Sequence, residues 1–323
     1  MKGIGAVIVT YNSEGEIGSC LDSVMSRVES VIVVDNASSD GTLAEVRKRP
    51  SVVLVANPGN RGFAAAVNQA IQALDARYIL LLNPDAVLQT GLEELAAACA
   101  EPGVGAAAGK LTGSQGGPQT GFSVRRFPTP LALGFEALGL NRIWPRNPVN
   151  KRYRCLDLNL EVAADVEQPA GAFLMIRREA WQAVGGFDEG FYPIWFEDVD
   201  FLKRVRSAGF RVRYTPGAVA RHVGGHSVAG IPWEPREVCW YGSLIMYSFK
   251  HFRFVGRLLV WAAVVTGCTL RAVYGVWRQR RLGPLAVYAR VISFACLRLL
   301  SGRIGEAGGT PALARQQSVR QGE

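Results

Sequence analysis

The fold class is indicated first by residues Ile4–Asp35, IGAVIVTYNSEGEIGSCLDSVMSRVESVIVVD. It contains two short β-branched runs, Ile4–Thr10 and Ser30–Asp35, with a stretch of helical period between them. Two similar runs follow at Ser51–Ala56 and Tyr78–Asn83, separated by the helical pattern FAAAVNQAIQAL. This alternation predicts the order βαβαβαβ, and hence an α/β fold with a mostly parallel sheet flanked by helices on both faces.

Polar residues follow each of these four runs. They are Thr10–Asn12, Asp35 with Asn36, the stretch NPGNRGF, and Asn83–Asp85. Open α/β sheets bind ligands at the carboxyl ends of their strands, so the pattern predicts a nucleotide-sized site at this edge. No GxGxxG follows the first run and no GxxxxGK[ST] occurs in the chain, so the phosphates must be held in another way.

The tripeptide NPD at Asn83–Asp85 has two interpretations. A carboxylate at the end of a strand could hold a divalent cation that bridges diphosphate oxygens. Asn, Pro and Asp are also turn formers, so a solvated turn is equally consistent with these three residues alone.

A second cluster of charge lies in FYPIWFEDVDFLKRVRSAGFR, at Phe191–Arg211, where Glu197, Asp198 and Asp200 fall within four positions. Carboxylates packed together beside aromatic residues lose hydration and repel one another. We therefore expect either a solvated helix start, with Asp198 as its cap, or a catalytic group.

Composition places the chain among globular proteins. It has 323 residues, of which 49% are hydrophobic and 20% charged, enough for one large core or two modest cores. The six cysteines are scattered, without a CxxC pair or zinc spacing, which predicts buried thiols in a reducing cytoplasm. No signal-like segment precedes Ile4, so we expect the protein to stay inside the cell.

The net charge of +9 is concentrated toward the C-terminus. From Arg236 onward there are 13 Lys or Arg residues and three acids, so residues 1–235 carry a charge near −1. The same part is rich in apolar and aromatic residues, but its uninterrupted run Leu258–Leu270 has 13 residues, short of the roughly 20 that span a bilayer. This pattern predicts a helical extension at 236–303 that lies in an anionic membrane surface, and no nucleic-acid binding. A helical subdomain packed on the core stays open as an alternative, and residues 304–323 are expected to form a disordered tail.

A family resemblance rests on seven motifs that occur in order: VIVTYN, VVDNASSDGT, NRGFAAAVNQA, LLNPDA, GAFLMIRREAWQAVGGFDEGF, FEDVDFLKRVRSAGF and HVGGHS. Together they resemble the inverting family 2 glycosyltransferases of the GT-A fold, particularly the bacterial rhamnosyltransferase-like branch. The resemblance covers about Ile4–Ser227 and is poor at Gly113–Glu161, which suits a mobile loop over the acceptor or a surface insertion. It implies a catalytic domain at 1–235, with a donor half at about 1–110 and an acceptor half at about 111–235.

The resemblance also implies an activity. Such an enzyme moves a sugar from a nucleotide diphosphate to an acceptor hydroxyl with inversion at the anomeric carbon. The expected donor is dTDP-rhamnose, and the expected acceptor is a lipid-linked or cell-surface polysaccharide intermediate. The protein would act as a peripheral enzyme at the cytoplasmic face of the cell membrane.

Carried over to this chain, the resemblance places the nucleotide-sugar-binding residues at Thr10, Tyr11, Asn12, Asp35, Asn36, Arg61, Asn83 and Asp85. Asn83 and Asp85 occupy the outer positions of the family's DxD motif, and the neutral Asn83 departs from it, which weakens the expected affinity for metal. The implied cofactor is a divalent metal, Mn²⁺ or Mg²⁺, held by Asp85 and His222. A neutral imidazole favours Mn²⁺.

For the acceptor side, the resemblance implies that Asp198 is the general base, with Glu197 and Asp200 orienting the acceptor hydroxyls or the base. Family turn positions near the acceptor match Gly171, Phe187 and Asp188, which also suit a plain tight turn. His226 has no matching position and is expected to be structural.

Two other classes of function stay open. A nucleotidyltransferase that makes sugar nucleotides would carry a Gly-rich basic loop after the first run, and TYNSEGEIGSC supplies none. A catalytically silent membrane-associated scaffold is disfavoured by the presence of Asp85, Asp198 and His222.

Overall fold

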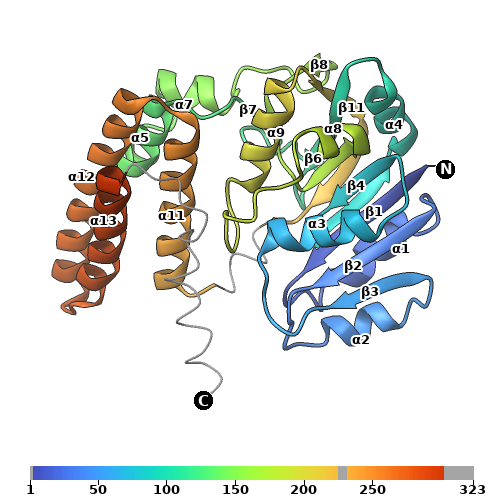
Figure 1. The fold of residues 1–323 in the computed structure, drawn as a ribbon, viewed down its shortest axis with the longest axis horizontal. Coiled ribbons are helices and arrows are strands. Elements are labelled where there is room, and N and C mark those ends of the chain that lie inside the picture. Colours follow the sequence, from blue (N-terminus) through green and yellow to red (C-terminus); the bar gives the residue numbers. More distant parts are fainter. Residues whose placement is uncertain (1–2, 225–230, 302–323) are drawn as a thin grey trace. The chain divides into compact units, whose positions relative to one another are not determined.

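The computed structural model describes residues 3–224 and 231–301 (Figure 1). The chain divides into two compact units. Unit 1 consists of Met1–Phe127, Arg154–Glu189 and Glu197–Gly230, and unit 2 of Pro128–Tyr153, Gly190–Phe196 and Ile231–Glu323. His226 and the expected tail at 304–323 lie outside the described residues.

Unit 1 is built around a mixed nine-stranded sheet. In spatial order its strands are β3 (Val52–Ala56), β2 (Ser30–Asp35), β1 (Ile4–Thr10), β4 (Tyr78–Leu82), β10 (Phe173–Arg177), β6 (Val104–Thr112), β11 (Arg211–His222) and β5 (Ala86–Thr90), with β8 (Ala164–Asp165) paired to β11. A separate two-stranded sheet is formed by β7 (Val124–Arg125) and β9 (Gln168–Pro169). The helices of unit 1 are α1 (Ile17–Val24), α2 (Thr42–Arg47), α3 (Phe63–Ala73), α4 (Leu92–Ala100), α8 (Arg178–Ala183) and α9 (Glu197–Ser207).

The expected fold class is confirmed. β1 pairs in parallel with β2 and β4, and β2 pairs in parallel with β3. Parallel strands bring their carboxyl ends to one edge, so β1 to β4 end together at Thr10, Asp35, Ala56 and Leu82.

The side-chain alternation of β1 explains why helices cover both faces of the sheet. All seven residues of β1 are buried. Ile4, Ala6 and Ile8 belong to the core that includes α1 and α4, whereas Val7 and Val9 belong to the core that includes α3 and α9. A strand covered on both faces reads as a continuous apolar run, as this one does.

The remaining strands make the sheet mixed. β10 runs antiparallel between β4 and β6, and β11 runs parallel to β6 and antiparallel to β5. The pairing of β11 with β6 shifts in register between Thr215 and Val219, where the strand bulges. Beyond the bulge, β11 ends with His222 opposite Ala86, the residue after Asp85.

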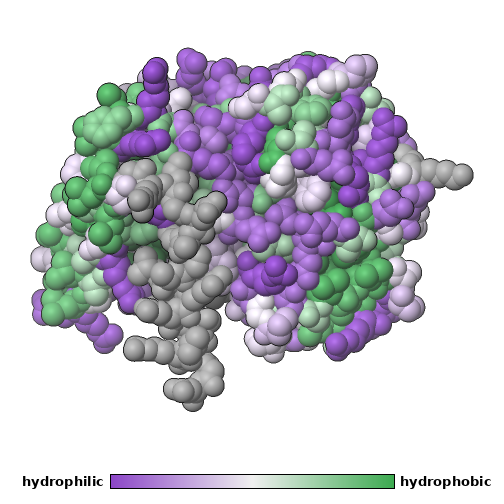
Figure 2. All heavy atoms as spheres, viewed as in Figure 1, coloured by the Kyte–Doolittle hydropathy of each residue, from purple (hydrophilic) through white to green (hydrophobic). Residues whose placement is uncertain are grey.

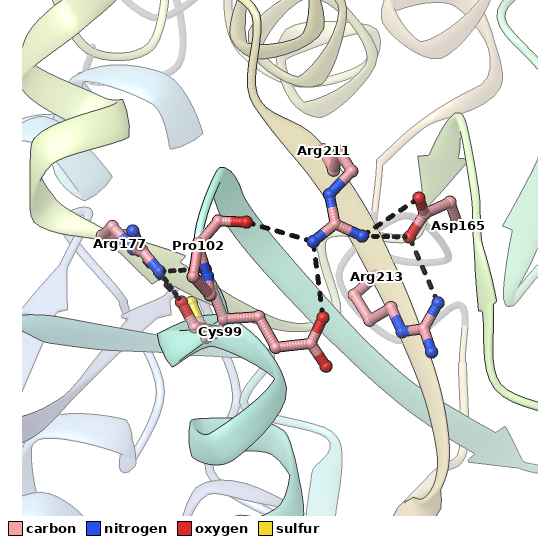
Figure 3. A network of polar contacts seen from close by, with 7 residues as sticks. Cys99, Pro102, Asp165, Arg177, Arg211 and Arg213 are labelled. Atoms are coloured by element: carbon pink, nitrogen blue, oxygen red, sulfur yellow. Dashed lines mark hydrogen bonds and ion pairs between the residues drawn. The ribbon is translucent and has the colours of Figure 1, made fainter.

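Arginine side chains fix the turn that joins α4 to β6 (Figure 3). The buried Arg177 donates hydrogen bonds to the carbonyl oxygens of Cys99 (2.6 Å) and Glu101 (2.6 Å) at the end of α4. At the start of β11, Arg211 donates to the Pro102 carbonyl (3.1 Å) and pairs with Asp165 (3.3 Å). These contacts connect the end of β10 with the starts of β6 and β11.

Unit 2 is helical. Its helices are α5 (Pro130–Leu138), α6 (Leu140–Ile143), α7 (Pro148–Tyr153), α11 (Trp233–His251), α12 (Phe254–Gln279) and α13 (Gly283–Ser301). α12 packs on α5 and α13, and its buried face carries small or β-branched residues such as Ala263, Val264 and Gly267. A Cβ at Gly134 of α5 would come within 3.2 Å of Leu259, so the two helices approach closely.

The outer surfaces of α12 and α13 are apolar (Figure 2). Large hydrophobic side chains are exposed there at Phe254, Val255, Leu258, Leu259, Leu270, Val273, Tyr274, Trp277, Leu285, Leu297 and Leu300. By length and composition alone, both helices are long and apolar enough to cross a membrane.

The cysteines are free thiols, as expected from their spacing. Four of them are buried, but Cys155 and Cys296 are only partly buried, which corrects the expectation that all six lie in the core. Burial raises the pKa of the Cys239 thiol to about 11 and that of Cys99 to about 12, so both remain protonated at neutral pH.

Candidate active site

The carboxyl ends of β1 and β2 are joined by a buried carboxylate. Asp35 is fully buried, and its Oδ1 accepts a hydrogen bond from the Thr10 hydroxyl (2.8 Å) while its Oδ2 accepts one from the Ser38 backbone N–H (2.8 Å). Thr10 and Asp35 are also partners in the strand register. The structure therefore gives Asp35 a framework role, and its contact with a base or ribose stays a prediction.

Tyr11 and Asn12 form the surface of the same edge. Asn12 has φ 50°, a left-handed conformation that Asn tolerates better than most residues. Its side-chain oxygen accepts a hydrogen bond from the Ser39 N–H (2.8 Å), and its own N–H donates to the Ser38 hydroxyl (2.8 Å). Tyr11 is 40% exposed, so its ring is available for stacking by a planar ligand.

Asn36 organises the loop that carries Arg61. It is buried, its Oδ1 accepts hydrogen bonds from Asn57 Nδ2 (3.1 Å) and the Arg61 N–H (3.4 Å), and its Nδ2 donates to the Gly62 carbonyl (3.2 Å). The Arg61 side chain is exposed. These predicted nucleotide residues thus divide into a buried scaffold (Thr10, Asp35, Asn36) and exposed groups (Tyr11, Asn12, Arg61).

Asp85 and His222 are brought together although they are distant in sequence. His222 Nε2 lies 3.4 Å from Asp85 Oδ1, both side chains are buried, and Asp85 Oδ2 accepts a hydrogen bond from the Gly224 N–H (3.1 Å). Burial acts to raise the pKa of Asp85, but the His222 contact and the backbone N–H groups outweigh it, so that the pKa lies below its usual range. Asp85 is therefore ionised at neutral pH, which a metal ligand requires.

Two residues that the sequence analysis missed fix the His222 ring. Gln119 Oε1 lies 3.1 Å from His222 Nδ1, and Gln119 Nε2 donates to the His222 carbonyl (2.7 Å). The Phe122 ring stacks on the imidazole, with centroids 5.3 Å apart and planes 9° apart. A metal ion bound between His222 and Asp85 would take the Nε2 lone pair, with Nδ1–H donated to Gln119 Oε1, an arrangement typical of metal-binding histidines. Both residues lie in the stretch Gly113–Glu161, where the motif pattern is poor.

The residues present fit a divalent metal that is shared with a substrate. Within residues 3–224 and 231–301 there is no group of three or more His, Cys, Asp or Glu side chains placed to hold a metal ion. Asp85 and His222 would supply two ligands. Mg²⁺-type sites commonly use one or two protein ligands and take the others from substrate phosphates and water.

Asp198 lies at the start of α9 and both of its oxygens are oriented. Its Oδ1 accepts a hydrogen bond from the Val199 N–H (2.8 Å) and its Oδ2 one from the Gly171 N–H (3.0 Å). A Cβ at Gly171 would come within 3.1 Å of the Asp198 Cβ, so this close approach favours glycine. Burial raises the pKa of Asp198, and the two N–H groups and the charge of Arg125 oppose this only in part. Asp198 is therefore a stronger base than a solvated aspartate.

The neighbouring acids have different environments. Asp200 is fully buried and accepts a hydrogen bond from Arg204 Nε (2.7 Å) in an ion pair, while Arg204 also donates to the carbonyls of Val184 (2.6 Å) and Gly186 (2.8 Å). Glu197 is buried. The backbone enters α9 through Trp195 (φ 83°) and Phe196 (φ 68°), and such strained conformations gather at functional sites.

The other predicted acceptor-side positions are Gly171, Phe187 and Asp188. Gly171 contacts Asp198 as described. Phe187 is a core residue, because its ring stacks on Phe201 (4.2 Å between centroids) and its N–H donates to Asn68 Oδ1 (2.9 Å). Asp188 is partly exposed.

Comparisons with known proteins show the family to which the chain belongs. The model of the family "Glycosyl transferase family 2" matches residues 6–183, and that of "N-terminal domain of galactosyltransferase" matches residues 155–224. The chain is 33% identical over 247 residues to N-acetylglucosaminyl-diphospho-decaprenol L-rhamnosyltransferase of Mycobacterium tuberculosis, covering 70% of this chain and 78% of the relative. It is 26% identical to rhamnosyltransferase WbbL of Escherichia coli, covering 68% and 83%.

Solved structures support the fold. The mannosyltransferase PcManGT of Pyrobaculum calidifontis, in complex with GDP-Man and Mn²⁺, superposes with a TM-score of 0.50 at 17% identity, covering 92% of this chain and 87% of that one. The family match favours sugar transfer over the nucleotidyltransferase alternative. The residues matched by the family model include most strands of the sheet, Asp85 and helix α8. We conclude that the chain belongs to glycosyl transferase family 2 and is a glycosyltransferase.

Proposed function

We propose that this glycosyltransferase moves rhamnose from dTDP-rhamnose to a hydroxyl of a lipid-linked acceptor in cell-surface polysaccharide synthesis, with inversion at the anomeric carbon. The observation that carries the proposal is Asp198, a carboxylate of raised pKa whose two oxygens are oriented by the Gly171 and Val199 N–H groups. The two rhamnosyltransferase relatives support the sugar, and the decaprenol-linked name of one supports the acceptor.

In the proposed reaction, Asp198 takes the proton of the acceptor hydroxyl. The acceptor oxygen attacks the anomeric carbon from the face opposite the nucleotide, and the bond from that carbon to the diphosphate oxygen breaks, with its electron pair leaving on the diphosphate. A positioned base contributes about 10²–10⁴-fold to such a step. Glu197 and Asp200 are proposed to act indirectly, and the ion pair of Asp200 with Arg204 supports a positioning role.

The donor is proposed to bind at the edge formed by β1 to β4. Tyr11, Asn12 and Arg61 are exposed there. The buried Thr10, Asp35 and Asn36 hold the loops that carry them, and Asn12 also bonds to the loop after β2. Asp85 and His222 would hold Mn²⁺ or Mg²⁺, which would neutralise the developing charge on the leaving diphosphate. Asn83, half-buried and two positions before Asp85, would contribute a neutral side chain.

We also propose that the enzyme works at the cytoplasmic face of the cell membrane. The exposed apolar side chains of α12 and α13 support this, together with the basic residues at the ends of both helices, such as Arg253, Arg278, Arg280 and Arg281. Positive charge flanks α12 at both ends. We therefore propose that α12 and α13 lie in the membrane–water interface and do not cross the bilayer as a helical hairpin. A polyprenyl acceptor would be available at the same surface.

The test is a donor screen with purified protein. dTDP-rhamnose, GDP-mannose and UDP-GlcNAc would each be supplied with a GlcNAc-diphospho-polyprenol acceptor, and release of nucleotide diphosphate and product mass would be measured. We expect rhamnosyl product of inverted anomeric configuration by NMR, and loss of it in Asp198→Asn. Transfer of another sugar would contradict the proposed donor, and a retained configuration would contradict the role of Asp198.

A further inference from the structure

One cation beside Asp198 has no counter-charge of its own. Arg125, on β7, is half-buried, and its Nε donates a hydrogen bond to the Gly121 carbonyl (2.9 Å). Its guanidinium lies over the Phe122 ring, 5.5 Å from the centroid. Among the residues that the structure describes, no carboxylate is within ion-pair distance of it.

The neighbouring cations differ in this respect. Arg126, the next residue along β7, pairs with Glu167 (3.6 Å). Arg204 on α9 pairs with Asp200 (2.7 Å). Partly desolvating a guanidinium that has no carboxylate in ion-pair contact, and only the longer-range charge of Asp198 near it, is unfavourable, so the arrangement points to an anion that comes from outside the protein.

Arg125 and Asp198 are fixed to the same piece of backbone. Arg125 is the register partner of Gln168 in the pairing of β7 with β9, and the Ala170 N–H donates to the Ser123 carbonyl (3.0 Å). The next residue, Gly171, donates its N–H to Asp198. The guanidinium is thus held at a fixed place near the proposed base, yet too far for an ion pair with it.

We propose that Arg125 binds a phosphate of the acceptor, namely the diphosphate attached to the sugar whose hydroxyl Asp198 deprotonates. This inference rests on the proposed function. An acceptor sugar on a lipid diphosphate presents its hydroxyl to the base and its phosphates about one sugar ring away, which suits an arginine near Asp198 but not in contact with it. The planar guanidinium fork binds phosphate oxygens in pairs, and the hydrogen bond to Gly121 sets its direction.

The test compares two acceptors that carry the same sugar. One is a short-chain polyprenyl diphosphate glycoside, and the other is a neutral alkyl glycoside. The variants are Arg125→Gln, Arg125→Lys and the control Arg126→Gln, which removes an adjacent charge that has its own partner. Acceptor binding is measured without donor by calorimetry, and KM and kcat are measured with donor present.

For the diphosphate acceptor, we expect Arg125→Gln to raise Kd and KM roughly 10- to 100-fold, the range for a lost hydrogen bond to a charged group. For the neutral acceptor and for the donor, its KM should stay near the wild-type value. Arg125→Lys should recover part of the affinity because it keeps the charge but not the fork. Arg126→Gln should leave both acceptors unaffected.

Equal loss on both acceptors would overturn the inference, because Arg125 would then act through Asp198 or the fold. A raised KM for the donor alone would also overturn it and would assign Arg125 to the donor diphosphate. Since Kd is measured without donor, the two proposals can fail separately. A wild-type protein that binds the charged acceptor but transfers no rhamnose would contradict the proposed function, while a raised Kd in Arg125→Gln would still support the role of Arg125 and an unchanged Kd would overturn it.

Discussion

His222 Nε2 lies 3.4 Å from Asp85 Oδ1, because β11 and β5 pair antiparallel and place His222 opposite Ala86. If the pair holds a divalent metal against the donor diphosphate, EDTA should abolish transfer and Mn²⁺ should restore it. Asp85→Asn should be almost inactive. The control Asp22→Asn removes an exposed carboxylate paired with Arg49 and should retain full activity. Full wild-type activity in EDTA would contradict the metal assignment.

Gln119 should tune the metal site without touching the metal. Gln119→Leu removes the partner of His222 Nδ1, so the imidazole loses its fixed orientation. Loss of such an outer partner typically weakens metal affinity about 10- to 100-fold. Mn²⁺ binding in the presence of a nucleoside diphosphate can be followed by electron paramagnetic resonance, with the exposed Gln89→Leu as the control. Unchanged Mn²⁺ affinity in Gln119→Leu would show that the glutamine is only structural.

Asp198→Asn should separate chemistry from binding. The base matters only when the acceptor loses its proton, so the rate should fall about 10²–10⁴-fold while the affinity for donor nucleotide stays near normal. Single-turnover kinetics and nucleotide calorimetry measure the two quantities. Normal transfer by Asp198→Asn, together with loss in Glu197→Gln, would move the role of base to Glu197.

The pH dependence of the wild-type rate should show the raised pKa of Asp198. A base must be ionised to accept a proton, so kcat should fall as the pH falls through that pKa. Because burial raises the pKa, the fall should occur at a higher pH than for a solvated aspartate. The residual rate of Asp198→Asn should lack this acidic limb. A limb that persists in the variant would belong to another group.

Asp200 should matter more for stability than for chemistry. Its carboxylate is fully buried and paired with Arg204, which in turn holds the carbonyls of Val184 and Gly186. Removing one partner of a buried pair costs about 3–5 kcal/mol, so Asp200→Asn should lower the free energy of unfolding measurably. Asp165→Asn, in the exposed network of Figure 3, should cost under about 1 kcal/mol. Equal stability of the two variants in urea unfolding would refute this distinction.

Membrane binding should depend on the exposed face of α12. Leu270 and Trp277 are 62% and 75% exposed, so replacing both with Asp should weaken binding to anionic liposomes without disturbing the buried face. The control Val53→Asp changes a 52% exposed residue of β3 in unit 1 and should bind like the wild type. High salt should weaken binding of the wild type by screening. Release by alkaline carbonate would support an interfacial position, and resistance to it would support a span.

The first four strands could be predicted because each is a local signal, a buried apolar run followed by polar residues. Asp85 stood out in the same way, as a carboxylate after the fourth run, whereas Asp198 stood out through the acidic cluster at Glu197–Asp200 and the family resemblance, and the roles of both stay predictions. The antiparallel position of β10 between β4 and β6 could not be predicted, because the residues Phe173–Arg177 do not indicate which strands they pair with. Gln119, Phe122 and Arg125 escaped notice because their importance arises from contacts that are distant in sequence. Gln119 and Phe122 contact His222, and Arg125 pairs with β9, just before the Gly171 N–H that bonds to Asp198.

The bulge in β11 limits which insertions and deletions this strand can accept. His222 reaches Asp85 only because the number of residues between Thr215 and the end of the strand is right. Side chains alternate between the two faces of a strand, so losing one residue from the bulge would turn the imidazole to the opposite face of the sheet. Surface loops can gain or lose residues one at a time. In β11, an even or odd number of residues in the bulge decides whether His222 faces Asp85, so the proposed metal site depends on the length of a segment whose own side chains do not contact it.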